Sequence, residues 1–542
     1  MNSVKQLNSN FVDLLELDLA EIKKKIELDY LQEDKFNSSV TGSRKSSDSQ
    51  KEYYTVSKTN IKHSQVLKIL LTHIYEVDFR EEAGVVEESE KLKYKDFLVT
   101  CSDKLLEAAE VSGLGICNSR ENVYLYNGEF WKRISNHKFY AFLGKSATKM
   151  GVNKNTSKHY TFREQFMKQL LSVADMYDDA DFEDYDDKDK ILINLSNGTF
   201  EIEGLNMRLK NPEKDDFLTY QLPFKYDENA ECPIFDNYLN TVLPDINNQK
   251  VLMEYLGYLF VRTKSLKLEK SLILYGRGAN GKSVLFEILN ALLGGSQNVS
   301  NYSLQNLTNE NGYYRAMLGN KLVNYASEIN GKMDVSIFKQ LVSGEPVDAR
   351  LPYGEPFTLS NYGKLIFNCN QLPTSVEHTH AFFRRFLIIP FEVTIPEEQQ
   401  DKQLAEKIIK SELSGVLNRV LEGLKRILRQ KGFTKSETSD ALLNKYKKES
   451  DTVSMFVEEM EYKPAEEFVM ASTLYEEYRS FCLQSGYKPI GKQYFNKRLK
   501  NNGFIIERRN IGMVAYVKKN RFAKTYSQTS QTSSDCISIN RN

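Results

Sequence analysis

The chain has 542 residues, which is too long for a single hydrophobic core, so we expect about three or four domains. Its 73 basic and 73 acidic side chains exclude a general attraction to nucleic acid, and any such contact must come from local patches. No apolar run reaches the ~18 residues that span a bilayer, and the first residues lack the apolar core of a signal peptide, so we expect a cytoplasmic protein without a membrane partner. The six cysteines include no C-x-x-C pair, which argues against a disulfide framework or a zinc ribbon.

The first half of the chain changes from helical to mixed patterning. Apolar residues at helical spacing dominate up to about residue 112, apart from a stretch rich in serine and charge around residues 38–51. Short aromatic strands begin near Val123, and a hairpin is predicted around Asn197-Gly198. The acidic run from Asp175 to Lys190 is interpreted as a solvated loop, because no flanking strand would aim its carboxylates at a metal ion.

A complete phosphate-binding loop occupies residues 276–283, which read G-R-G-A-N-G-K-S. An apolar strand precedes it and an amphipathic helix follows it. Backbone N–H groups of such a loop, together with the helix N-terminus, surround a phosphate chain. Lys282 would reach the β- and γ-phosphates of ATP, and the Ser283 hydroxyl would hold Mg²⁺. The expected nucleotide contacts are Gly276, Gly278, Ala279, Asn280, Gly281, Lys282, Ser283 and Val284.

Polar residues after later strands complete the candidate site. Glu328 ends an apolar strand and is the candidate to polarise the attacking water and to help hold Mg²⁺. Asn370 ends another strand, where an amide can report the state of the γ-phosphate, although asparagine is also common in turns. Arg384 and Arg385 precede a third strand, and an arginine supplied across a subunit interface would stabilise charge on the γ-phosphate.

The last folded unit, at about 452–519, reads as three helices and a hairpin, which is a winged-helix pattern. Its basic residues are expected to face DNA phosphates, with a protein-interaction role as the alternative. These residues are Lys492, Lys497, Arg498, Lys500, Arg508 and Arg509.

These motifs, in this order, resemble the superfamily 3 helicases, a branch of the AAA+ ATPases. The resemblance is closest to the helicase part of phage and plasmid primase–helicases and of the poxvirus helicase–primase. It covers about residues 115–520. It includes the segments 192–200 and 224–233, the phosphate-binding loop, and the segment 338–350, which is similar to a motif particular to this superfamily.

The resemblance implies a homo-oligomer, a hexameric ring around single-stranded DNA, with ATP bound between subunits. Arg385 would be the trans arginine, with Arg384 as its substitute, and Asn370 the sensor. A hairpin at about 345–357 would point into the channel. Its implied DNA contacts are Lys339, Arg350 and Tyr353.

Two positions depart from the family pattern. Ser327 stands where many relatives have an acid before Glu328, so Glu328 would serve both the water and the metal. The hairpin tip has no lysine, which leaves its DNA-contacting side chain open. Residues 1–175 also lack a convincing set of primase carboxylates, so primer synthesis is not expected.

Together these features predict a multidomain α/β protein. It has a central AAA+ P-loop ATPase of the superfamily 3 type, a helical N-terminal region, an α+β pre-helicase domain and a C-terminal winged helix. The expected bounds are an N-terminal helical segment at 1–35, a flexible linker at 36–52, a helical region at 53–112, the pre-helicase domain at 113–232, the ATPase at 233–395, a helical lid at 396–450, the winged helix at 451–520 and a disordered tail at 521–542.

The predicted function is ATP-dependent, ring-forming unwinding of DNA during replication of a phage, plasmid, virus or other mobile element. The setting would be the cytoplasm of a bacterial host or a viral replication compartment. Duplex origin DNA and a separate primase or polymerase are further expected partners. The alternatives are an ATP-switched origin-binding or loader protein, and a helicase–primase with an unrecognised primase. A GTPase is disfavoured because no N-K-x-D motif is present.

Overall fold

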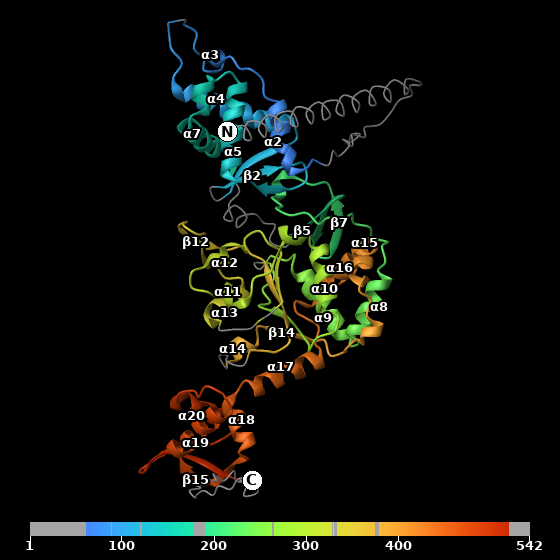
Figure 1. Ribbon diagram of the computed structural model, residues 1–542, viewed down its shortest axis with the longest axis vertical. Helices are drawn as coiled ribbons and strands as arrows, with labels where there is room; N and C mark the ends of the chain where they lie inside the picture. Colours follow the sequence, from blue (N-terminus) through green and yellow to red (C-terminus); the bar gives the residue numbers. More distant parts are fainter. Residues whose placement is uncertain are drawn as a thin grey trace, which may run out of the picture. The chain divides into compact units, whose positions relative to one another are not determined.

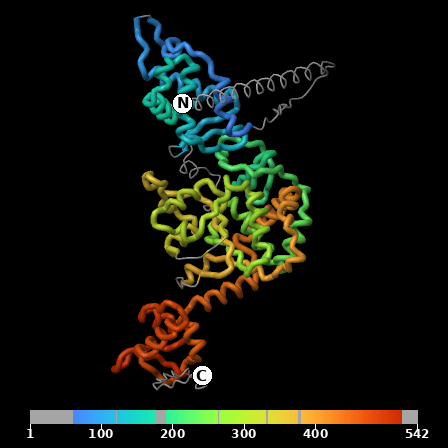
Figure 2. Tube along the Cα trace, viewed as in Figure 1, coloured from blue at the N-terminus to red at the C-terminus, as the bar shows by residue number. Residues whose placement is uncertain are grey.

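The computed structural model describes residues 61–519, except 88, 120–121, 177–189, 263–264, 328, 330–332 and 374–378. The elements are labelled in Figure 1, and Figure 2 traces the chain path. The segments expected at 1–35, 36–52 and 521–542 lie outside the described residues, as does most of the acidic run. Among the helices that the structure describes, none is long and apolar enough to cross a membrane.

The first core combines helices with a small sheet. Its helices are α2 (His63–Thr72), α3 (Phe79–Glu82), α4 (Tyr94–Val111), α5 (Asn136–Lys149), α6 (Lys154–Lys158) and α7 (Tyr160–Val173). Its strands are β1 (Gly115–Ser119), β2 (Asn122–Tyr126), β3 (Trp131–Arg133) and β4 (Asp175–Met176), in the order β3-β2-β1-β4. Leu70, Leu105, Val123 and Phe166 are buried in the same cluster, so helices before residue 112 and strands after it share one core.

A three-stranded antiparallel sheet follows, made of β5 (Lys190–Leu195), β6 (Gly198–Glu203) and β7 (Asn206–Lys210). The hairpin predicted around Asn197-Gly198 is confirmed, with Leu195 paired to Gly198. Gly198 has φ +152°, and a Cβ there would lie 2.6 Å from the carbonyl of Lys210, so only glycine fits. Ile193 and Phe200 pack into the large core of the domain that follows.

That domain is built on a parallel five-stranded sheet in the order β14-β8-β13-β10-β9. The strands are β8 (Ser271–Tyr275), β9 (Val299–Ser300), β10 (Val323–Ala326), β13 (Lys364–Cys369) and β14 (Phe386–Pro390). Alternate side chains of β8 enter different cores, since Leu272 and Leu274 face one side and Ile273 the other. The sheet is therefore buried on both faces, as parallel sheets are.

Helices cover the two faces, as Figure 1 shows. Five helices share the core of Leu272, namely α8 (Pro233–Val242), α9 (Ile246–Tyr258), α10 (Lys282–Leu292), α15 (Leu404–Ser411) and α16 (Leu413–Gln430). Four share the core of Ile273, namely α11 (Leu304–Leu307), α13 (Val335–Ser343), α14 (His380–Phe383) and α17 (Glu437–Glu449). The result is a three-layer α/β domain.

The C-terminal unit has its own core around Phe456, Tyr478 and Phe495. Its elements are α18 (Thr452–Glu459), β15 (Tyr462–Met470), α19 (Ala471–Gln484), α20 (Lys492–Asn501), β16 (Ile506–Arg509) and β17 (Gly512–Lys519). The three helices and the hairpin agree with the sequence pattern, but β15 was not predicted. This strand is mostly exposed and its register breaks between Pro464 and Phe468, so it has no regular apolar alternation to reveal it.

A buried carboxylate joins α16 to the start of α8. Glu412 is 5% exposed, and its Oε1 and Oε2 accept hydrogen bonds from the backbone N–H groups of Ile234 (3.0 Å) and Phe235 (2.9 Å). These N–H groups lie in the first turn of α8 and have no partner within the helix. The charge of Glu412 also complements the positive end of the helix dipole.

We expect Glu412→Ala to destabilise the protein by about 1–3 kcal/mol, because two buried donors lose their acceptor. Differential scanning fluorimetry should show a lower melting temperature. Glu422→Ala is the matched control, since Glu422 lies on α16, the helix that Glu412 immediately precedes, and forms an exposed pair with Arg419. An equal effect of the two substitutions would contradict the capping role.

Lys364, the first residue of β13, has a desolvated ammonium group. Its Nζ donates to the carbonyl of Val261 at 2.6 Å and lies 4.3 Å from the centre of the Tyr258 ring. Burial lowers the pKa of Lys364 to about 7. The unfolded chain keeps this proton up to about pH 10.4, so between these values the unfolded state binds more protons and stability rises with pH.

This linkage predicts a pH-dependent difference between wild type and Lys364→Met. The melting temperature of wild type should rise relative to the variant by a few degrees between pH 7 and pH 9.5. Scanning fluorimetry across that range measures the difference. The exposed Lys402, substituted to methionine, should leave the pH profile unchanged. If the melting temperatures of wild type and Lys364→Met change with pH in parallel, the pKa of Lys364 is not lowered by folding.

Candidate nucleotide site and nucleic-acid interface

The phosphate-binding loop connects β8 to α10 in a conformation that its glycines permit. Gly278 and Gly281 have φ values of +113° and +83°, a region that favours glycine. Gly276 is needed for space, because a Cβ there would lie 2.1 Å from Asn280 Nδ2 and 2.3 Å from the carbonyl oxygen of Phe391. Ala279 also has a positive φ, of +48°. The loop is thus bent tightly with its backbone close to neighbouring groups.

The catalytic lysine candidate lies folded against this loop. Lys282 is 6% exposed, and its Nζ donates to the carbonyl of Gly276 at 2.7 Å and to Asn280 Oδ1 at 3.0 Å. Burial lowers the pKa of the Lys282 ammonium. Both of these acceptors are neutral oxygens, so a buried cation lies at the loop beside the exposed Ser283 of the helix N-terminus. Val284 follows on α10, half-buried against the core.

Neighbouring strands hold the loop in place. The N–H of Gly276 donates to the carbonyl of Cys369 at the end of β13, at 3.0 Å. Asn280 Nδ2 donates to the carbonyl of Phe391, which follows β14, at 2.9 Å. The N–H of Ile395 donates to the carbonyl of Ala279 at 2.8 Å. The loop is therefore attached to the strands on both sides of β8.

The register of the sheet brings a second predicted residue to this edge. Cys369 pairs with Tyr275, so the exposed Asn370 follows β13 where Gly276 follows β8. Beside it, Tyr325 on β10 donates its hydroxyl to Asn368 Oδ1 at 2.9 Å. Glu328 lies outside the described residues, two positions after the end of β10. Among the described residues, no cluster of three or more histidine, cysteine or acidic side chains could hold a metal ion.

The two arginines lie at the opposite edge of the sheet and differ in exposure. Arg385 is 7% exposed, donating from Nη1 to the carbonyl of Ala381 at 2.5 Å and from Nη2 to Ser343 Oγ at 2.9 Å. The side chain of Arg384 is 45% exposed and forms an ion pair with Glu269. The family resemblance implied Arg385 as the trans arginine with Arg384 as its substitute, but here the guanidinium of Arg385 is occupied inside the chain. Glu269 itself was not anticipated, since a single acid before a strand carries no pattern.

The expected hairpin is formed by β11 (Val347–Arg350) and β12 (Pro356–Leu359). Tyr353 is fully exposed at its tip, and Arg350 Nε donates to the carbonyl of Gly354 at 2.8 Å. Lys339 lies on α13, the helix before the hairpin. The hairpin places these three expected DNA contacts on one short segment of chain and its preceding helix.

A buried arginine that the sequence did not reveal anchors this hairpin. Arg315, in the short helix α12 (Tyr313–Ala316), is 4% exposed. Its Nε donates to the carbonyl of Asp348 on β11 at 2.7 Å, and Nη1 donates to the carbonyls of Leu307 and Asn309. A lone arginine in a polar stretch of sequence gives no signal for such a role, which depends on folding.

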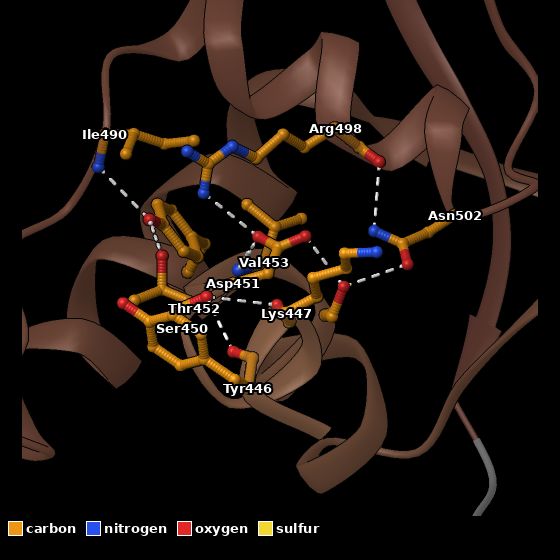
Figure 3. Close-up of polar contacts among 11 residues, drawn as sticks. Tyr446, Lys447, Ser450, Asp451, Thr452, Val453, Ile490, Arg498 and Asn502 are labelled. Atoms are coloured by element: carbon orange, nitrogen blue, oxygen red, sulfur yellow. Dashed lines mark hydrogen bonds and ion pairs between the residues drawn. The ribbon is translucent and has the colours of Figure 1, made fainter. Parts of the chain in front are cut away.

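The basic residues of the C-terminal unit do not all face solvent. Lys492, Lys497 and Lys500 are exposed on α20, and Arg508 and Arg509 are exposed on β16. Arg498 departs from the expected phosphate-facing set. Figure 3 shows its guanidinium turned toward Asp451, which it contacts at 3.0 Å with only 18% of the side chain exposed.

Asp451 explains that inward position. It caps α18 by accepting from the N–H of Val453 at 3.1 Å and from Ser454 Oγ at 2.8 Å. The ion pair therefore joins α20 to the start of α18 within one unit (Figure 3). A charge held in this way serves the packing of the unit, so its phosphate-binding candidates are the five exposed basic residues.

Three family descriptions match successive parts of the chain. Residues 111–244 match the family described as D5 N terminal like, residues 274–385 match a family of unknown function, DUF5906, and residues 448–533 match the family described as Poxvirus D5 protein-like. Two parts of the chain are thus similar to families described by their likeness to D5. The outer two matches flank the phosphate-binding loop, and the middle one contains it.

Two curated viral relatives are named as helicases. A protein of Acanthamoeba polyphaga mimivirus is 27% identical over 256 residues, which is 44% of this chain and 25% of the relative. A protein of Invertebrate iridescent virus 3 is 24% identical over 279 residues, which is 46% of this chain and 28% of the relative. The matched region thus spans about a quarter of the length of these two relatives.

Solved structures of the NrS-1 C-terminal region were also found. One has a TM-score of 0.41 at 14% identity, covering 66% of this chain and 77% of the other. A second has a TM-score of 0.40 at 12% identity, covering 77% of this chain and 98% of the other.

The space around Gly276 gives a direct test of the loop. We expect Gly276→Ala to weaken binding of a fluorescent ATP analogue by more than about tenfold, because the added methyl would overlap Asn280 and the Phe391 carbonyl. Fluorescence anisotropy measures the change. Gly491→Ala is the control, since a Cβ at Gly491 meets open space. Unchanged binding by Gly276→Ala would show that this loop does not hold the nucleotide.

Proposed function

We propose that the protein is an ATP-dependent DNA helicase that forms a ring and unwinds DNA during the replication of a virus or other mobile element. The observation that carries the proposal is the phosphate-binding loop. Hydrogen bonds attach this loop to the end of β13, which Asn370 follows, and to the segment after β14. Similarity to D5-like proteins and to viral proteins named as helicases supports it. The central domain would be an AAA+ ATPase of the superfamily 3 type, and the C-terminal unit a winged helix.

The residues at the loop fit ATP and Mg²⁺. The glycines leave the room a phosphate chain needs, and the Lys282 ammonium can exchange two neutral acceptors for anionic phosphate oxygens. The Ser283 hydroxyl stands at the N-terminus of α10, where it would help to hold Mg²⁺. The metal would neutralise charge on the β- and γ-phosphates. Asn370 would hydrogen-bond the γ-phosphate, and Glu328 would polarise the attacking water.

We infer that an arginine acts on a neighbouring subunit, and the geometry of the sheet supports this inference. Arg385 precedes β14, and Phe386 pairs with Ser271, the first residue of β8. The loop begins after Tyr275, the last residue of β8. A strand rises about 3.3 Å per residue, so the arginines and the phosphates of one chain lie on opposite edges, roughly 15 Å apart. A second subunit would bring the two edges together.

Exposure favours Arg384 as this trans residue. Its guanidinium forms a partly exposed pair with Glu269, which it can exchange for a γ-phosphate, whereas Arg385 would have to leave buried partners. Arg385 would then position the segment, since its guanidinium donates to the carbonyl of Ala381 and to Ser343 Oγ. Arg384 would thus act on the γ-phosphate, and Arg385 would hold the segment that carries Arg384.

ATP hydrolysis with and without single-stranded DNA tests the proposal. DNA should stimulate wild type, while Lys282→Ala and Glu328→Gln should abolish hydrolysis. Arg384→Ala should lower the rate by about a thousandfold or more. Mixing Arg384→Ala with Lys282→Ala subunits should restore part of it, because a site is complete where the intact loop of an Arg384→Ala subunit meets the intact arginine of a Lys282→Ala subunit.

Two controls make the result specific. Arg479→Ala removes a comparably exposed, ion-paired arginine elsewhere and should leave hydrolysis unchanged. Arg385→Ala should lower the melting temperature as well as the rate. If nucleotide binds but hydrolysis ignores DNA, the protein is an ATP-switched origin-binding or loader protein, and the helicase proposal fails.

A further inference from the structure

The tip of the β11–β12 hairpin carries an aromatic side chain with unusual exposure. Tyr353 has a relative exposure of 104%, the highest among the exposed large hydrophobic residues that the structure describes. The other exposed aromatic on the hairpin is Phe357 on β12, at 38%. A tyrosine ring usually gains by covering some of its surface. The hairpin instead presents the whole ring to solvent.

The backbone holds Tyr353 in a conformation that tyrosine disfavours. Its φ is +62°, the left-handed region, where bulky side chains are rare. The neighbouring Gly354 would adopt this conformation more easily, since glycine lacks a Cβ. Gly354 N–H donates to the carbonyl of Leu351 at 2.9 Å, and Arg350 Nε donates to the Gly354 carbonyl. These bonds, with a proline on each side of the turn at positions 352 and 356, fix the tip.

The hairpin carries a net negative charge, which repels phosphates. Between residues 345 and 357 it carries three carboxylates, those of Glu345, Asp348 and Glu355, and one guanidinium, that of Arg350. Its formal net charge is therefore −2. Because phosphate contacts depend on neutralisation by lysine and arginine, a negative hairpin without a lysine cannot supply affinity in that way. A flat, neutral ring remains at its apex.

We propose that Tyr353 grips single-stranded DNA by stacking its ring on a base. The assignment rests on the proposed function, and it deepens that function because the hairpin would hold exposed bases rather than the charged backbone. Stacking tolerates any base sequence, because every base has a π-face. The rigid, strained tip keeps the ring extended before DNA arrives, so little conformational freedom is lost on binding.

Binding of the full chain to two fluorescent strands, in the presence of a non-hydrolysable ATP analogue, tests this inference. One strand is oligo-dT, and the other has the same length and backbone but abasic residues. We expect Tyr353→Ala to weaken binding to oligo-dT by about 10- to 100-fold. Tyr353→Phe should stay within about threefold of wild type, since stacking needs the ring and not the hydroxyl. Wild type should bind the abasic strand about as weakly as Tyr353→Ala binds oligo-dT, and Tyr353→Ala should lose little more on it.

Tyr160→Ala is the matched control, since Tyr160 is 68% exposed on α7, far from the hairpin in sequence. Its DNA affinity should be unchanged. The melting temperature of Tyr353→Ala should also stay unchanged, because the ring packs on nothing. If wild type binds oligo-dT and the abasic strand equally, or Tyr353→Ala binds oligo-dT as wild type does, stacking is overturned while the helicase proposal stands. If wild type binds neither strand and its hydrolysis ignores DNA, both proposals fail.

Discussion

Hydrogen bonds between the phosphate-binding loop and the strands beside β8 determine the geometry of the whole candidate site. The N–H of Gly276 reaches β13, and Asn280 reaches the segment after β14, so the loop can form only when three parallel strands are in register. Gly276 stands where any side chain would overlap these partners. The same register places Asn370 beside the loop. Burial of the sheet on both faces by two separate cores keeps the strands in this register.

A parallel sheet has two chemically different edges, and in this protein each edge carries candidate catalytic residues. The loop and Asn370 lie at the carboxyl edge, while Arg384 and Arg385 lie at the amino edge of the same strands. One subunit therefore cannot bring arginine and phosphate together. Oligomerisation, in the proposed function, supplies the missing geometry and makes hydrolysis depend on neighbouring subunits. The two adjacent arginines have different environments, because the chain turns Arg385 inward and leaves Arg384 at the surface.

The hairpin shows a second use of a fixed backbone. Arg315 anchors β11 through carbonyl groups on two segments, and Arg350 closes the tip around Tyr353. Buried arginines hydrogen-bonded to carbonyls are costly to desolvate, so their presence indicates that a defined hairpin position matters. In the C-terminal unit Arg498 is similarly withdrawn from solvent by Asp451. In both places an arginine withdrawn from solvent sets the shape, and in the C-terminal unit five other basic residues of α20 and β16 are exposed.

The sequence by itself determined the local features. The strand, glycine loop and helix around Lys282 were readable because each depends on near neighbours, and so were the hairpin at Gly198 and most helices of the described chain. The position of Asn370 next to the loop could not be predicted in this way, because it depends on the register between β13 and β8. Only the tertiary structure decided which arginine is exposed, that Arg498 pairs with Asp451, that Arg315 anchors the hairpin and that β15 completes a sheet. These outcomes depend on contacts between residues distant in the chain, and neither composition nor spacing encodes which side chain a fold will bury.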